Sequence, residues 1–457
     1  MQERYYLLSL GCPKNEVDAE VMTTRLEEST FQFTPHPSQA DFLIVNTCAF
    51  IDAAKKEAIE AILDLAAIKE EQKARGREVY LLVTGCLAQR YAEEIYHEFP
   101  EVDSVLGTRE YGKIVERCKE LKQRAERICT LPAKGDSLAH LKKPHKASAD
   151  RSYAYLKIAE GCSNACAFCA IPSIRGGMKS RPIEELVEEA RSFAEAGFKE
   201  QILIAQDSSR YGQDLYGEPS LPKLLRELVK VPGLERLRLM YVYGDSFSDE
   251  LIELMQQEPK ILRYIDLPVQ HASDRILTAM RRRETRSSLE ALITKLRSAL
   301  PGLILRTTVM VGFPGETDED FQELLEFTKK MAFDRLGCFT FCPEEGTLAA
   351  GMKDQVDPAV AQARYEAIMS QQQGISRKAN EARIGQICDI LLEGISEDGI
   401  FFTGRSYGEA PDIDPVIRIA AQAPGHETGE LLRCRIVTAG DYELTAVSLE
   451  GAYELSE

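Results

Sequence analysis

Residues 161–169 read Gly161-Cys-Ser-Asn-Ala-Cys-Ala-Phe-Cys169, which spaces Cys162, Cys166 and Cys169 as C-x3-C-x2-C. Three thiols at this spacing can each reach one iron of a cubane cluster, and the fourth iron is left without a protein ligand. Structural clusters usually have four cysteine ligands, so three ligands predict an open, reactive site, by the logic that separates catalytic from structural zinc sites. The alternative is a zinc knuckle or chance clustering. It is disfavoured because zinc takes four ligands and no fourth Cys or His lies nearby.

This stretch directly follows the first of a series of apolar strands that alternate with helices. The pattern predicts six βα-like units, and hence an incomplete TIM-type barrel with its active site at the carboxyl ends of the strands. The helix near residue 319 has a capping box, with Thr317 as N-cap and Asp320 three residues later. The expected strands are 155–159, 201–205, 237–242, 264–267, 304–311 and 336–341. The expected helices are 183–196, 221–228, 249–257, 287–299 and 319–331.

A second set of cysteines recurs upstream, where three short apolar strands run into Cys12, Cys48 and Cys86. The intervening stretches 16–29, 53–70 and 88–98 have a helical pattern. Because strands that alternate with helices form a parallel sheet, their carboxyl ends meet at one edge. We therefore expect the three thiols to converge and to hold a second cluster with one open iron. The alternative is three buried thiols that pack as small hydrophobes.

The rest of the chain completes a three-part α/β organisation. Residues 131–150 are polar and rich in Pro, Gly and Ser, which is typical of a linker. Residues 359–382 are predicted to form one long helix. The five short strands expected after Gly385 indicate a small antiparallel β-barrel. The expected units are an N-terminal parallel α/β domain (1–130), the linker, the partial (β/α)6 barrel (151–375) and the small barrel (376–457).

Composition narrows the class of protein. The chain has 457 residues and a net charge of −17, which disfavours strong direct binding to nucleic acid. It has 12 cysteines and no apparent export signal or membrane-spanning stretch, so we expect a cytoplasmic protein whose cysteines bind metal or stay reduced. The six cysteines outside the two triplets are expected to be structural: Cys118, Cys129, Cys338, Cys342, Cys388 and Cys434.

The two triplets in this order, followed by a small β-barrel, resemble the methylthiotransferase family of radical S-adenosylmethionine (SAM) enzymes over essentially the whole chain. The resemblance implies two 4Fe-4S clusters, SAM as cofactor, and a C-terminal TRAM barrel that binds substrate. It also implies that the Cys162 cluster reductively cleaves SAM, and that the Cys12 cluster carries the sulfur that is inserted. A low-potential electron donor of the flavodoxin or ferredoxin type is then expected.

Three strings resemble the ribosomal-protein branch of that family, whose members modify the β-carbon of an aspartate in ribosomal protein uS12. They are Ser9-Leu-Gly-Cys-Pro-Lys-Asn15, Ala205-Gln-Asp-Ser-Ser-Arg-Tyr-Gly212 and Gly404-Arg-Ser-Tyr-Gly-Glu-Ala-Pro411. Residues 376–457 hold 7 Lys and Arg against 15 Asp and Glu, a net charge of −8. An acidic barrel suits a basic protein partner, such as uS12 or the small ribosomal subunit, better than tRNA. The alternatives are a tRNA adenosine methylthiotransferase and a non-catalytic iron–sulfur electron-transfer or scaffold protein.

The groups that contact SAM are less well specified, because the second barrel strand ends in Ala205-Gln206-Asp207 and not in the Gly-Gly-Glu of many radical SAM enzymes. Gln206 and Asp207 are candidates by position, as are Arg306 and the turn that begins at Gly312. For Arg306 a structural ion pair is an equal alternative. His271 is expected to be a structural histidine. The run Arg281-Arg-Arg283 is expected to form a solvated face.

Overall fold

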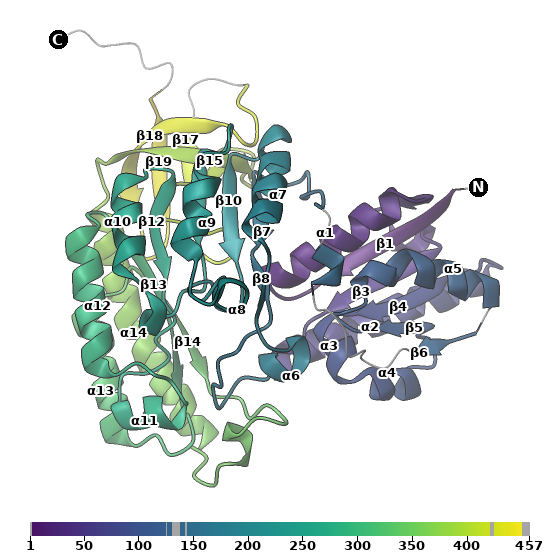
Figure 1. The fold of residues 1–457 in the computed structure, drawn as a ribbon, viewed down its shortest axis with the longest axis horizontal. Coiled ribbons are helices and arrows are strands. Elements are labelled where there is room, and N and C mark those ends of the chain that lie inside the picture. The colour runs from purple at the N-terminus through teal and green to yellow at the C-terminus, as the bar shows by residue number, and fades with distance from the viewer. Residues whose placement is uncertain (1, 125, 130–137, 142–143, 421–424, 450–457) are drawn as a thin grey trace.

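The computed structural model describes residues 2–124, 126–129, 138–141, 144–420 and 425–449. Parts of the expected linker (131–137, 142 and 143) and the last residues of the expected small barrel (450–457) lie outside this range. Figure 1 shows an N-terminal sheet domain in purple to blue, an open barrel in teal to green, and a small yellow barrel at the C-terminal end. No helix in the described ranges combines the length and the apolar character needed to cross a membrane.

The N-terminal domain is built on a six-stranded parallel sheet with the order β2-β1-β3-β4-β5-β6. Alternate side chains of β3 and β4 enter two separate apolar cores, one on each face, so both strands are buried throughout. The elements are β1 (Glu3–Ser9), α1 (Pro13–Glu27), β2 (Phe31–Phe33), η1 (Pro37–Gln39), β3 (Phe42–Thr47), α2 (Asp52–Ala74), β4 (Tyr80–Thr84), α3 (Gly85–Arg90), α4 (Ala92–Glu98), β5 (Ser104–Leu106), η2 (Tyr111–Lys113), α5 (Ile114–Arg124), β6 (Ile128–Cys129) and η3 (Ala139–Leu141).

The helical stretch expected over 88–98 is two helices, because Tyr91 leaves the helical conformation with φ −130° and ψ 41°. Arg90 and Tyr91 at this break both reach the loop that follows the last barrel strand. Arg90 Nη1 lies 2.9 Å from Glu344 Oε2, and the Tyr91 hydroxyl donates to Glu345 Oε2 at 3.2 Å. The break thus accompanies a contact between the two larger parts of the molecule.

The predicted partial barrel is confirmed: six parallel strands follow the order β7-β10-β11-β12-β13-β14. The capping box of α13 is also present, with Thr317 and Asp320 bonded reciprocally. The elements are β7 (Tyr153–Lys157), β8 (Ala159–Glu160), α6 (Ile171–Arg175), β9 (Lys179–Ser180), α7 (Ile183–Glu195), β10 (Glu200–Ile204), α8 (Gln213–Tyr216), α9 (Leu221–Leu228), β11 (Arg236–Leu239), η4 (Gly244–Ser246), α10 (Asp249–Gln257), β12 (Ile261–Asp266), α11 (Asp274–Ala279), α12 (Arg286–Ala299), β13 (Ile304–Val311), α13 (Asp318–Met331), β14 (Arg335–Thr340) and η5 (Ala349–Gly351).

The long helix α14 (Pro358–Glu381) leads into a closed five-stranded barrel. Four of its five strand pairings are antiparallel, but β17 and β19 pair in parallel, so the barrel is not purely antiparallel as expected. The reason is geometric: in a closed ring with an odd number of strands, directions cannot alternate all the way round. The strands are β15 (Ile387–Ile395), β16 (Phe402–Arg405), β17 (Ile417–Ala420), β18 (Leu431–Ala439) and β19 (Leu444–Ser448).

The small barrel docks on the amino ends of the large-barrel strands, at the upper end of the molecule in Figure 1. Arg236, the first residue of β11, donates to the carbonyl of Asp389 at 2.7 Å, and Arg405 pairs with Glu200 at 3.0 Å. The segment that follows Arg405 closes the barrel floor, because Asp412 accepts a hydrogen bond from the Tyr153 hydroxyl at 2.8 Å. One end of the large barrel is therefore closed, and the chemistry has to be sought at the carboxyl ends.

Candidate functional site

The first cysteine triplet lies at the carboxyl ends of three neighbouring strands. Cys12 caps α1 after β1, Cys48 directly follows β3, and Cys86 lies in the first turn of α3 after β4. Because β3 lies between β1 and β4 in the sheet, the three loops share one edge. The approach is close at Gly11, whose φ is +99° and where an added Cβ would lie 3.0 Å from Cys48 Sγ. The structure thus brings together cysteines that are far apart in sequence.

Asn15 joins the loops that carry these cysteines. Its Nδ2 donates to the carbonyls of Leu10 and Thr47, both at 2.9 Å, which connects the ends of β1 and β3. Its Oδ1 accepts from the Cys86 thiol at 3.7 Å. A fully buried amide that bonds to all three strand ends fixes their spacing, because each of its polar atoms would be costly to leave without a partner.

The second triplet lies on the loop between β8 and α6, at the carboxyl end of the first barrel strand. The Cys162 N–H donates to the Gly176 carbonyl at 3.0 Å, which folds the loop back on itself. Gly161 has φ +77°, and an added Cβ would lie 2.6 Å from that carbonyl oxygen, so only glycine fits before Cys162. The Asn164 N–H donates to Cys162 Sγ at 3.4 Å.

All six thiols are free, which suits them to bind metal. Burial raises the pKa of Cys86 to about 12, that of Cys162 to about 11 and that of Cys169 to about 12. Burial also raises the pKa values of Cys48 and Cys166. Since a metal binds the thiolate, loading either site must release protons. Two convergent sets of free thiols, each at the carboxyl edge of a parallel sheet, fit the iron–sulfur clusters that the sequence implies.

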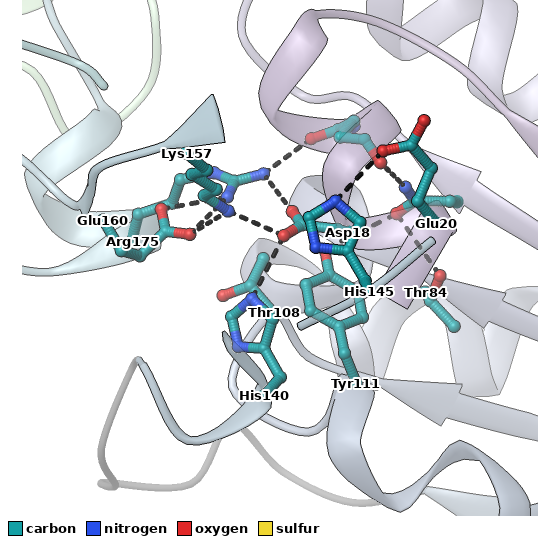
Figure 2. Close-up of polar contacts among 12 residues, drawn as sticks. Asp18, Glu20, Thr84, Thr108, Tyr111, His140, His145, Lys157, Glu160 and Arg175 are labelled. Carbon is teal, nitrogen blue, oxygen red and sulfur yellow. Dashed lines mark hydrogen bonds and ion pairs between the residues drawn. The ribbon is translucent and has the colours of Figure 1, made fainter. Parts of the chain in front are cut away.

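A buried ion network lies between the first triplet and the strand end that leads into the second, and Figure 2 shows how its charged members lie. Arg175 Nη1 lies 3.0 Å from Glu160 Oε1 on the barrel side. Its Nη2 reaches the N-terminal domain, at 3.0 Å from Asp18 Oδ2 and 3.4 Å from Cys86 Sγ. Lys157 Nζ lies 2.7 Å from Asp18 Oδ1. Arg175 therefore touches both a cysteine of the first triplet and the strand end that leads into the second.

Charge pairing in this network outweighs the cost of burial. Burial alone would raise the pKa of Glu160, but Arg175 and Lys157 lower it to about 2. The same two cations hold the pKa of Asp18 well below its usual range, although burial opposes this. His140, from the described part of the predicted linker, lies 3.2 Å from Asp18. Asp18, His140 and Glu160 could hold a metal ion by their spacing, but Lys157 and Arg175 already neutralise these carboxylates.

This network was not predicted, because Asp18, Lys157 and Arg175 are ordinary charged residues in separate elements. One signal was available: Lys157 and Glu160 flank a strand end whose other residues are apolar. A charge in a strand that is buried on both faces requires a partner. The identity of that partner was not readable, since Asp18 lies more than 130 residues away.

Gln206 and Asp207 lie beside the second triplet, with different bonding. Gln206 Nε2 donates to Glu160 Oε1 at 3.1 Å, whereas its buried Oε1 has no hydrogen-bond partner among the described residues. Both oxygens of Asp207 are occupied, by the Ser209 hydroxyl at 2.6 Å and by Asn164 Nδ2 at 2.7 Å. Gln206 therefore offers a free acceptor, and Asp207 fixes the cysteine loop through Asn164.

The other predicted SAM candidates lie on β13 and just after it. Arg306 forms an ion pair with Asp266 at 2.7 Å, so the structural alternative for this arginine is present. Gly312 has φ +75°, and an added Cβ would lie 2.6 Å from Ala361 Cβ on α14. His271 is fully buried; its Nδ1 accepts from the Ser273 N–H at 3.0 Å, and its Nε2 lies 3.6 Å from Glu316.

The expectation that Arg281, Arg282 and Arg283 form one solvated face is wrong for Arg282, which is 8% exposed. Arg281 has φ +59°, so the chain reverses after α11 and directs the next side chain inward. Arg282 lies 4.3 Å from the ring centroid of Tyr243 and donates to the Pro268 carbonyl at 2.9 Å. Burial has the largest effect on the pKa of Cys166 and raises it, and Arg282 has the next largest effect and lowers it.

Three family models match successive parts of the chain. Residues 4–107 match Uncharacterized protein family UPF0004, residues 156–328 match the Radical SAM superfamily, and residues 384–448 match the TRAM domain. The first stretch holds most of the N-terminal sheet but not β6, and the second holds most of the six-stranded barrel but not β14. The third holds all five strands of the small barrel.

Relatives match nearly the full length. The ribosomal protein uS12 methylthiotransferase RimO of Citrifermentans bemidjiense is 45% identical over 446 residues, which is 97% of this chain and 98% of that protein. The protein of the same name from Desulforamulus reducens is 46% identical and covers 96% of this chain and 98% of its own length. Among solved structures, the radical SAM methyltransferase TsrM from Kitasatospora setae has a TM-score of 0.55 at 15% identity, over 76% of this chain and 77% of that one. This last likeness shows the fold alone.

Proposed function

This chain belongs to the ribosomal protein uS12 methylthiotransferase family, and we propose that it transfers a methylthio group to the β-carbon of an aspartate in uS12. It is a radical SAM transferase, and its cofactors are SAM and 4Fe-4S clusters. One observation carries the assignment to this site. Two triplets of free thiols lie at the carboxyl edges of two separate parallel sheets, and Arg175 contacts residues of both edges.

Each triplet would hold one cluster. Cys162, Cys166 and Cys169 would bind the cluster that supplies the electron for SAM cleavage, and Cys12, Cys48 and Cys86 the cluster that supplies sulfur. The protein's part is to orient these groups and to exclude water. Asn15 sets the spacing of the first triplet, and Asn164, held by Asp207, supports the loop of the second. The buried network around Arg175 would hold the two sheet edges in a fixed relative position.

The free oxygen of Gln206 would accept a hydrogen bond from the amino group of SAM. This amide lies at the carboxyl end of β10, and its other end is anchored on Glu160, two residues before Cys162. Asp207 would act through Asn164, whose Nδ2 donates to it at 2.7 Å. Arg306 and the turn at Gly312 would complete the wall of the SAM site on the β13 side.

The proposed domain boundaries follow the chain's own breaks: the N-terminal domain over 1–130, the linker over 131–150, the radical SAM domain over 151–375 and the TRAM domain over 376–457. The described part of the linker supports a fixed connection. His145 is buried, with Nδ1 at 2.9 Å from Glu189 on α7 and Nε2 at 3.2 Å from Glu20 on α1. A segment held this way clamps the N-terminal domain against the barrel.

The TRAM barrel would present its remaining acidic side chains to uS12 or to the small ribosomal subunit. Glu409 and Asp412 are used internally, since they pair with Arg335 and Tyr153 of the large barrel. The exposed acids, such as Glu397, Asp398 and Glu427, are free to meet a basic protein surface. A low-potential flavodoxin or ferredoxin type of donor would supply electrons. A ribosomal-protein substrate favours a cytoplasmic enzyme.

The test is anaerobic turnover with SAM, a strong reductant and either purified uS12 or small ribosomal subunits, followed by peptide mass spectrometry. A methylthio group on an aspartate of uS12 is expected. A matched reaction with bulk tRNA should give none. Modified tRNA with unmodified uS12 would replace the proposal by a tRNA methylthiotransferase. An absence of 5′-deoxyadenosine in every reaction would point instead to a non-catalytic iron–sulfur protein.

A further inference from the structure

Lys14, two residues after Cys12, is a cation in an environment that is unfavourable for a positive charge in two respects. It lies in the first turn of α1, where the positive end of the helix dipole disfavours a cation. It is also only 7% exposed, and burying an ammonium group is costly unless a carboxylate pairs with it. Departures from local preference that nothing nearby offsets tend to mark functional positions.

Among the described residues, the Lys14 side chain has no hydrogen-bond partner, and no carboxylate oxygen lies within 4.0 Å of its Nζ. Its Nζ instead lies 2.9 Å from the ring centroid of Tyr241. The acid that influences it from the barrel, Asp266, is committed elsewhere. One Asp266 oxygen pairs with Arg306 at 2.7 Å, and the other accepts from the Tyr241 N–H at 3.1 Å. Lys14 therefore holds three donor hydrogens without an anionic acceptor.

Tyr241, which the Lys14 ammonium contacts, belongs to a barrel segment that also reaches the second triplet. Tyr241 lies two residues beyond the carboxyl end of β11 and has φ +60°, a conformation that is uncommon for a bulky residue. Two residues later, Tyr243 interacts with the Cys166 thiol. Lys14 thus extends from the Cys12 loop of one triplet onto a barrel segment that reaches the other triplet.

We propose that Lys14 binds the side-chain carboxylate of the uS12 aspartate that is modified. This deepens the proposed function and rests on it. The carboxyl carbon of an aspartate is bonded directly to the β-carbon, so a cation that holds the carboxylate also positions the carbon that receives sulfur. Lys14 takes no part in making or breaking bonds. It selects a substrate with a negative charge next to the reacting carbon, which an adenosine base lacks.

The test compares two forms of uS12: the natural protein and a form in which the modified aspartate, located by mass spectrometry, is replaced by asparagine. The dissociation constant of each form is measured with reconstituted wild-type enzyme and with each variant. The variants are Lys14→Met, which keeps length but loses charge, and Lys14→Arg, which keeps charge. Lys119→Met is the matched control, because Lys119 is exposed on α5.

Wild-type enzyme should bind the aspartate form roughly ten- to a hundredfold more tightly than the asparagine form, as expected for a hydrogen bond between charged groups. Lys14→Met should bind both forms equally, and Lys14→Arg should keep a preference. Lys119→Met should behave as wild type. Equal binding of both forms by wild-type enzyme would overturn the proposal, as would an unchanged preference in Lys14→Met.

Two outcomes separate this inference from the broader function. If wild-type enzyme modifies uS12 but does not distinguish the two forms, Lys14 has a different role, such as a counter-charge for the Cys12 thiolate. If wild-type enzyme neither binds nor modifies uS12, the proposed function itself fails. Should Lys14→Met fail to fold, the wild-type comparison and Lys14→Arg still decide the question.

Discussion

Arg175 Nη2 donates to Cys86 Sγ across 3.4 Å, from helix α6 of the barrel to helix α3 of the N-terminal domain. The same guanidinium neutralises Asp18 and Glu160, both of which are buried. One side chain from the barrel thereby stabilises the loop geometry of the first triplet, and the relative placement of the two domains depends on it.

Replacing Arg175 by Met should lower the free energy of unfolding by about 3–5 kcal/mol, because it leaves two buried carboxylates short of a cation. Denaturant unfolding of the cluster-free protein measures this change. The matched control is Arg283→Met, since Arg283 has 65% of its side chain exposed and should shift stability by less than about 0.5 kcal/mol. Equal effects of the two substitutions would contradict a central role for Arg175.

Replacing Cys86 by Ala should remove about half of the iron that the reconstituted protein binds, since one of two clusters loses a ligand. Cys118→Ala is the comparison, because Cys118 is also fully buried but packs in the apolar core beneath α5. It should keep its full iron content. Iron and sulfide analysis after anaerobic reconstitution gives the answer, and an unchanged iron content in Cys86→Ala would remove Cys86 from the ligand set.

His145 should make the protein less stable in mildly alkaline solution. Burial opposes its charge, but Glu189 and Glu20 outweigh burial and raise the pKa of His145 to about 9, from 6.5 in the unfolded chain. The folded state holds the proton more tightly, so its contribution is fully present below a pH of about 6.5 and is lost as the pH rises through about 9. This shift corresponds to about 3 kcal/mol of stability.

Urea unfolding between pH 6 and 10 tests this dependence. Wild-type protein should lose stability across that window, and His145→Gln should lose much less because the titrating group is gone. The comparison variant is His97→Gln, at an exposed position on α4, and it should retain the wild-type slope. A His145→Gln profile parallel to that of wild type would show that other groups set the slope.

Replacing Gln206 by Ala should weaken SAM binding roughly tenfold, because a hydrogen bond to the amino group of SAM is lost. Iron content reports separately on the Cys162 cluster, and SAM binding is measured by equilibrium dialysis. Gln322→Ala serves as control, since Gln322 is exposed on α13. Unchanged SAM affinity in Gln206→Ala would assign the amino group to another acceptor.

Local sequence signals predicted much of the fold. The helices over 221–228 and 249–257 and the strand over 304–311 have the predicted bounds, because the periodicity that predicts each of them lies within the element itself. The failures involve contacts between elements. Tyr91 interrupts a helix at the point where it contacts a distant loop. Arg282 is buried because the residue before it, Arg281, has a left-handed conformation. The residues next to Tyr91 and Arg282 in the sequence do not predict either feature.

The sequence by itself determined the order of strands and helices and the two sets of cysteines, because these depend on residue type and short-range spacing. Only the tertiary structure decided which charges meet. Asp18, Lys157 and Arg175 come from three elements and acquire their roles when two domains enclose them. Packing between domains also decided which end of the large barrel the TRAM domain covers. It likewise left Lys14 without a carboxylate partner among the described residues. The energy of a buried charge depends on the groups that surround it, and the tertiary fold determines which groups those are.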